Sequence, residues 1–310
     1  MTTPVLFNSS RDGQRNLVNT FIKQPAVVQR RLLKMTDQQF LGDALLRTGP
    51  DALGGVVLYE ESTPLYSGGG DAPVVAEYGR IPAARGRFGQ PMAVRTVKRA
   101  LAVEYSEEVR RRDNVGAVDT QLMQVKNTFV RTWENAFLSA ILNNPRVNTL
   151  AATDYWDLST SKIRYDIAEA KFVVEESDSD TVDGSGEDKF NFEPDTLVLS
   201  NRTATDFIES DDFNKLFVGS PAVRESLQYT GKAPKQAMGL DVVKSRRLPP
   251  QVAIVLQRKI IGGISDERPL GVGPTERDGR SEVYFQNVVR QSAIFIDQPK
   301  AACIITGVHS

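Results

Sequence analysis

Between Gly54 and Val103 the chain contains so many glycines and prolines that neither a helix nor a compact core is expected there. A short apolar run, Val56–Tyr59, reads as a strand before this stretch becomes irregular. The returning limb, Met92–Tyr105, alternates its side chains between two faces as a strand does. We therefore predict a long, extended two-stranded excursion, and a loop of this length without a core normally has a functional reason.

Helical sequence precedes the excursion. Between Arg11 and Arg47, apolar residues come in pairs spaced for one helical face, and Pro25 is among the breaks that divide the stretch into short pieces. Seven basic residues stand against three acidic ones here. We expect an arm that lies on other chains and not a compact domain.

The most regular segment of the chain follows the excursion. From Val118 to Leu142, apolar residues recur at steps of three or four, which predicts a helix of about 37 Å at 1.5 Å per residue. Phe129, Trp133 and Phe137 on this helix are interpreted as core residues. Ser106 is expected to cap a shorter helix before it, with a break near Gly116.

The second half alternates helices and short strands, which indicates an α+β fold. We predict helices at 161–175 and at 201–217, the latter capped by Ser200 or Asn201, strands at 196–200, 240–244 and 252–256, and a polar loop at 265–280. The closing strands are expected at 281–287, 292–297 and 301–306, the last two joined as an antiparallel pair through Asp297–Lys300. The acidic run at 175–188 superficially resembles a calcium loop, but its glycine falls one place late and no glutamate follows at the twelfth position, so we expect a solvated loop and no metal site.

Residues for catalysis are scarce. The single histidine, His309, is the next-to-last residue, so no histidine-based catalytic or zinc site is expected in an ordered position, and the single cysteine, Cys303, cannot form an intrachain disulfide. Carboxylates near the helix start, such as Glu107, are explained by salt bridges to Arg110, Arg111 and Arg112. No glycine motif has the flanking strand and helix of a phosphate or dinucleotide site. We expect no enzyme and no cofactor.

The net charge of -1 and a pI near 6.0 argue against a dedicated nucleic-acid binder. The first ten residues do not have the pattern of a signal peptide, and no apolar run is long enough to span a bilayer. We therefore expect no membrane association, and a chain that stays in the cytoplasm unless it leaves within a larger particle.

The order of these segments resembles that of the Hong Kong 97-type major capsid proteins of tailed bacteriophages, over almost the whole chain. The similarity lies in Val94–Arg112 leading into the long helix, in Thr196–Phe217, in Met238–Leu256 and most specifically in Val288–Val308 with its Pro-Lys-Ala turn. The resemblance implies an N-terminal arm (1–54), an extended E-loop (55–103), a peripheral domain with a spine helix (104–148), an axial domain with a mixed sheet (149–262) and peripheral closing strands (263–310). It implies that the closing strands form the outer edge of a shell tile, with Cys303 as a buried apolar residue.

The same resemblance implies a function. The chain would self-assemble into pentamers and hexamers of an icosahedral shell around double-stranded DNA, contacted non-specifically, and would reside in the virion after assembly in the host cytoplasm. A separate scaffolding protein, a portal and a decoration protein are implied partners. The assembly interface is expected to include the E-loop and spine-helix residues Tyr66, Tyr78, Arg80, Arg85, Arg87, Phe88, Arg110, Arg111 and Arg112.

Two alternatives stay open at this point. An encapsulin, a cellular nanocompartment of the same fold, is separated poorly from a phage shell by sequence. A carboxylate-based enzyme is the third reading. One branch of the capsid family cross-links its shell through an E-loop lysine, but Glu60–Met92 contains no lysine here and Lys98 lies at the loop base, so we expect no cross-link.

Overall fold

The long helix expected after the excursion is the central support of the molecule. The computed structural model describes residues 17–36, 41–52, 54–65, 72–84, 86–158, 160–178, 189–210 and 235–310. In it, α5 (Val115–Leu142) has 28 residues, about 42 Å at 1.5 Å per residue. It begins before the predicted start because the Asn114 side chain accepts a hydrogen bond from the Ala117 N–H at 3.2 Å. The preceding α4 (Glu107–Arg111) is capped by Ser106 as predicted, and the break expected near Gly116 lies at residues 112–114.

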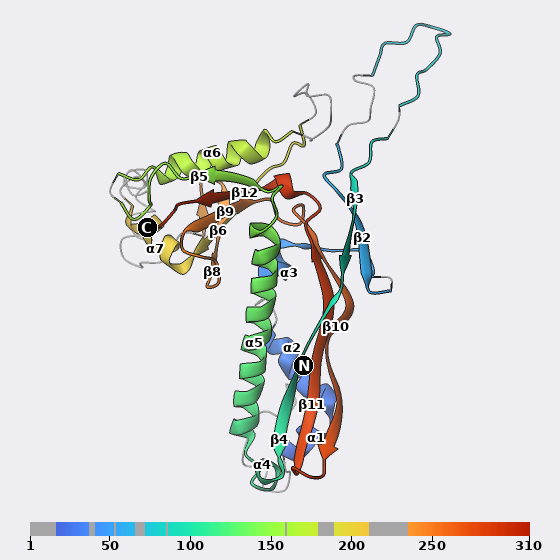
Figure 1. Ribbon diagram of the computed structural model, residues 1–310, viewed down its shortest axis with the longest axis vertical. Coiled ribbons are helices and arrows are strands. Elements are labelled where there is room, and N and C mark those ends of the chain that lie inside the picture. Colours follow the sequence, from blue (N-terminus) through green and yellow to red (C-terminus); the bar gives the residue numbers. More distant parts are fainter. Residues whose placement is uncertain are drawn as a thin grey trace, which may run out of the picture.

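A four-stranded sheet packs beside α5 (Figure 1). Its order is β1-β10-β11-β4, comprising β1 (Arg47–Thr48), β10 (Gly263–Asp278), β11 (Val283–Phe295) and β4 (Val97–Ser106). The expectation of a polar loop at 265–280 is wrong, because this segment is the long strand β10, antiparallel to β11. The loop was predicted because the run is polar, and the run also contains prolines and glycines. They fall at or beside irregularities of the ladder, where a missing N–H or side chain is tolerated.

The N-terminal helices pack on their own chain. These are α1 (Leu17–Lys23), α2 (Pro25–Thr36) and α3 (Leu41–Leu45), with the expected break at Pro25. Val18, Phe21 and Leu32 are buried in one cluster with Leu122 of α5. The prediction that this whole arm lies on other chains is therefore wrong for the described helices, because the paired apolar residues cover the chain's own α5 and sheet.

A six-stranded sheet forms the second body of the molecule. Its order is β5-β12-β9-β6-β8-β7, comprising β5 (Asn148–Ala151), β12 (Ala302–Thr306), β9 (Val252–Leu256), β6 (Thr196–Ser200), β8 (Leu240–Ser245) and β7 (Gln236–Ala237). The strands predicted at 196–200, 240–244 and 252–256 are confirmed. Helices α6 (Ile163–Glu175) and α7 (Asn201–Glu209) pack on it, and Ser200 caps α7 as predicted. The prediction that this helix continues to 217 is wrong, because α7 ends at Glu209 and Ser210 has an extended backbone. Residues 211–217 and most of the acidic run at 175–188 lie outside the described residues.

The closing strands differ from the prediction. The strands predicted at 281–287 and 292–297 are parts of one continuous strand, β11, which spans 283–295 and does not pair with the last strand. A single 3-10 turn, η2 (Pro299–Ala301), instead sends the chain from the four-stranded sheet into the six-stranded one. There β12 lies between β5, parallel, and β9, antiparallel. Cys303 is buried as expected, on a strand that has a hydrogen-bonded neighbour on each side.

Candidate interaction surfaces

The excursion predicted from glycine and proline is present. β2 (Val56–Glu61) pairs antiparallel with β3 (Gln90–Arg95), and between them the extended loop, residues 62–89, leaves the body of the molecule (Figure 1). Its described part contains no helix or strand. Large apolar side chains on it are highly exposed: Val74 by 101%, Tyr78 by 100%, Ile81 by 81% and Phe88 by 79%. An exposed apolar set of this size marks an interaction surface.

The residues expected at an assembly interface do not form one cluster. Tyr78, Arg80 and Phe88 are exposed on the extended loop, and Arg87 is partly buried there, whereas Tyr66 and Arg85 lie outside the described residues. Arg110, Arg111 and Arg112 lie at the other end of α5 (Figure 1). The structure therefore separates the two predicted groups.

The arginines near the start of α5 have partners on their own chain. Arg110 and Arg111 both contact the Glu107 carboxylate, at 2.5 and 3.3 Å. The hydrogen bond from Arg110 lowers the pKa of Glu107 below its ordinary value. The intrachain salt bridges expected from the sequence are thus confirmed for Glu107.

A defined turn lies on the extended loop. The Gly79 N–H donates to the Ala76 carbonyl at 2.8 Å, which places Glu77 and Tyr78 at the two central positions. Tyr78 has a φ of 63°, a left-handed conformation that is uncommon for a residue with a side chain. The turn presents the whole tyrosine ring to solvent.

A polar clamp holds the base of the loop. Arg146, just beyond α5, donates to the buried Glu61 carboxylate of β2 at 2.6 Å and to the Gln90 side chain of β3. Arg47 pairs with the buried Asp297. Burial raises the pKa of Asp297, and the nearby Arg47 partly opposes that rise. Arg146 lies 85 residues from Glu61 and 56 residues from Gln90 in the sequence. No local spacing relates residues so far apart, so the sequence did not predict this clamp.

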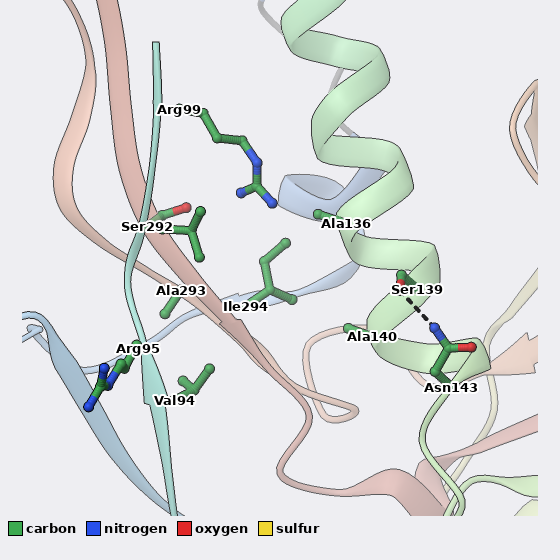
Figure 2. Close-up of a pocket in the computed structure, with 11 residues that line it drawn as sticks. Val94, Arg95, Arg99, Ala136, Ser139, Ala140, Asn143, Ser292, Ala293 and Ile294 are labelled. Carbon is green, nitrogen blue, oxygen red and sulfur yellow. Dashed lines mark hydrogen bonds between the residues drawn. The ribbon is translucent and has the colours of Figure 1, made fainter.

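A groove lies between α5 and the β3–β4 limb (Figure 2). It has a volume of about 350 Å³, and its apolar lining consists of Val94, Val97, Ala136, Ala140, Ala293 and Ile294. Its polar lining consists of Arg95, Arg99, Ser139, Asn143 and Ser292. The Ser292 hydroxyl is buried and has no hydrogen-bond partner in the described part of the chain.

Arg99 reaches into this region, whereas the Arg95 side chain points away from α5 on the other side of the strand (Figure 2). Arg99 lies 4.7 Å from the centre of the Trp133 ring, and burial lowers the pKa of Arg99. Arg95 is exposed. Within the described residues, no carboxylate is paired with Arg99, so the groove combines an apolar floor with one uncompensated positive charge.

His309 occupies an ordered position, contrary to expectation. It is buried, with Nδ1 3.1 Å from an Asp206 carboxylate oxygen and 3.6 Å from one of Asp157. Burial raises the pKa of Asp206. This close approach brings the end of the chain against α7. In the part of the chain that the structure describes, no cluster of side chains suits a metal ion, and no helix is long and apolar enough to cross a membrane.

Comparisons with known proteins agree with this architecture. A family model described as phage capsid protein matches residues 89–301, more than half of the chain. No curated protein sequence matches this chain. A phage-related protein from Bordetella bronchiseptica RB50 has a similar crystal structure, with a TM-score of 0.61 and 13% identity over 91% of this chain and 96% of that one.

Two assembled particles also have similar chains. The virus-like particle from Pyrococcus furiosus gives a TM-score of 0.57 and 12% identity over 92% of this chain and 100% of that one. The capsid of Myoviridae phage XM1 gives a TM-score of 0.54 and 12% identity over 87% of this chain and 91% of that one. At such low identity these likenesses show a common fold.

Proposed function

The chain belongs to the phage capsid protein family and is a major capsid protein with a Hong Kong 97-like α+β fold, and from this premise we propose how it builds a shell. Copies of the chain associate into pentamers and hexamers of an icosahedral shell, and each copy covers its extended loop with a neighbouring copy. The role is structural and not enzymatic. The family match does not favour the encapsulin alternative.

One observation carries this proposal, the exposed apolar surface of the extended loop. Val74 and Tyr78 have almost no contact with their own chain. Fully burying a side chain of this kind contributes about 1.5–3 kcal/mol. A closed shell repeats the contact at every subunit, so modest single contacts add to a stable assembly.

The charged residues of the loop have a secondary role in this proposal. Arg80 would pair with an acidic residue across the subunit boundary, and Arg85 and Arg87 likewise. Each such exposed pair is worth under about 1 kcal/mol and weakens with salt. The apolar contacts therefore provide most of the association free energy.

The remaining partners follow from the role in a virion. Assembly takes place in the host cytoplasm with a separate scaffolding protein, a portal closes one vertex, and a decoration protein can bind outside. The enclosed double-stranded DNA is contacted through its phosphates without sequence preference, so the contact weakens with salt. The functional parts of the chain have the boundaries 1–54, 55–103, 104–148, 149–262 and 263–310. The strand β12 is the exception, because it lies in the six-stranded sheet.

Removal of the loop tests the proposal. Deleting residues 67–87 should leave a folded, soluble subunit that forms no particles in electron micrographs, with a scaffolding protein coexpressed if the parent chain needs one. A matched variant keeps the length of the loop but changes Val74, Tyr78, Ile81 and Phe88 to serine. It should fail in the same way, since apolar contact and not length is required. Shells from both variants would refute this role of the loop.

A further inference from the structure

We propose that the groove between α5 and the β3–β4 limb binds a small amphipathic anion, a carboxylate on an apolar tail of about ten atoms, as in a medium-chain fatty acid. The carboxylate would pair with Arg99 and accept a hydrogen bond from the Ser292 hydroxyl, and the tail would lie on the apolar floor. The inference concerns the single subunit and does not depend on the proposed function.

The floor of the groove suits an apolar tail. Ala136 and Ala140 are small residues on the helix side, and Ile294 of β11 lies across the groove from them (Figure 2). Each methylene group that moves from water onto this floor favours binding. The volume of about 350 Å³ is at the low end of the ~300–1,000 Å³ typical of ligand pockets, so the groove suits one short tail with its head group.

The register of β4 and β11 places the polar groups of the groove. Ser292 of β11 pairs directly with Val97 of β4, and Arg99 lies two residues further along β4. Side chains two residues apart on a strand share a face of the sheet, so Arg99 and Ser292 both lie on the face that lines the groove. One carboxylate could therefore contact both side chains.

Both polar groups lack the partner that such a carboxylate would supply. Ser292 is 1% exposed, and its hydroxyl has no hydrogen-bond partner in the described part of the chain. Arg99 contacts the face of the Trp133 ring, and no described carboxylate is paired with it. Buried polar groups in folded proteins normally have hydrogen-bond partners, so a ligand that accepts from both groups is favoured here.

The lining distinguishes this ligand from other classes. A phosphate or sulfate would lose much of its hydration against apolar side chains, with a single arginine in return. A neutral apolar molecule would leave Arg99 without a counter-charge, and an apolar cation would be repelled by it. A monoanion with an apolar tail satisfies the charge, the hydroxyl and the floor together.

Decanoate is the probe that tests the site. Titrated into unassembled subunits of the full chain at pH 7 and followed by calorimetry, it should bind with a dissociation constant of about 0.1–1 mM, the range for about a dozen non-hydrogen atoms in an open groove. Decylammonium has the same tail and the opposite charge, so it should bind at least about tenfold more weakly. No binding of decanoate, or equal affinity for both, overturns the proposal.

Matched variants locate the site. Arg99→Gln should weaken decanoate binding at least about tenfold, the effect of losing a hydrogen bond to a charged group. Arg95→Gln is the control, because Arg95 points away from α5 (Figure 2). Ala136→Leu fills the groove and should abolish binding, whereas the same change at the exposed Asn135, which does not line the groove, should not. Ala136→Leu keeps the contact between Arg99 and Trp133, so it decides the case if Arg99→Gln does not fold.

A photoreactive probe gives an independent readout. A decanoate analogue with a diazirine at the end of its tail is irradiated with the subunit, and labelled tryptic peptides are identified by mass spectrometry. The label should fall on residues 132–146 or 291–300, which contribute to the groove and are bounded by tryptic sites, and excess decanoate should prevent it. Labelling only outside both peptides, or unchanged binding in Ala136→Leu, overturns the site and leaves the shell role intact.

Discussion

At the scale of single residues, Arg146 joins the extended loop to the end of α5. Its partner Glu61 is 4% exposed, so removing the arginine leaves a buried carboxylate without its ion pair. We expect Arg146→Met to lower the free energy of unfolding by about 2 kcal/mol, the scale of a hydrogen bond to a charged group. Urea unfolding of the subunit measures this change.

A double-mutant cycle shows whether the loss comes from the pair. Glu61→Gln removes the buried charge, so Arg146→Met should cost less in that background. Equal costs in both backgrounds would mean that Arg146 does not act through Glu61. Lys98→Met, an exposed residue near the loop base, is the control and should change stability by less than about 0.5 kcal/mol.

Asp297 gives a second prediction, on pH. Because its folded pKa is raised by burial, the folded chain binds this proton more tightly than the unfolded chain does. Its contribution to stability is full below the ordinary aspartate pKa and is lost as pH rises through the folded pKa. The measured quantity is the unfolding free energy of the parent chain minus that of the Asp297→Asn variant. This difference should fall as pH rises from the ordinary aspartate pKa through the raised folded pKa of Asp297. A difference that rises instead would contradict the direction of the shift.

At the scale of elements, α5 is attached to the four-stranded sheet through Trp133. Its ring lies 4.7 Å from the guanidinium carbon of Arg99 on β4 and 4.6 Å from that of Arg290 on β11. Arg290 is itself paired with Asp266 of β10 and Asp43 of α3. The tryptophan thus couples the helix to several strands at once.

Trp133→Ala should therefore destabilise the subunit strongly. We expect a loss of about 3–5 kcal/mol, because a buried aromatic is removed and a cavity remains. Met123→Ala on the same helix is the control, since Met123 is 48% exposed and should change stability by less than about 1 kcal/mol. Similar thermal unfolding of both variants would show that Trp133 does not hold the helix to the sheet.

Elements also show what local pattern can predict. The sequence predicted α5 from apolar residues at steps of three or four, and β6 from its all-apolar centre. Both predictions were correct, because the buried positions of each element form a pattern that is visible within a few residues. β10 was missed because it is an irregular strand whose ladder to β11 changes register three times. Its polar and glycine-rich sequence becomes a strand only when β11 supplies hydrogen bonds.

At the scale of the whole molecule, the extended loop should be the part most changed by assembly. Arg80 is exposed in the free chain on a segment without regular structure, so trypsin should cut there rapidly. Assembled particles should resist this cut, because the loop is covered by a neighbour. Gel electrophoresis after a timed digest measures both rates. Equal cleavage in subunits and particles would show that the loop stays exposed.

The sequence by itself determined the α+β class, the long helix and the uncovered loop, because each depends on residues close together in the chain. It also placed Tyr78, Arg80 and Phe88 on that loop. Only the tertiary structure decided that α1 and α2 pack on their own sheet, that η2 sends β12 into the other sheet, and that Arg146 clamps the loop base. The groove belongs to the same group, since it needs α5, β3, β4 and β11 together. These features depend on contacts between distant residues, and no local spacing specifies which distant surfaces meet.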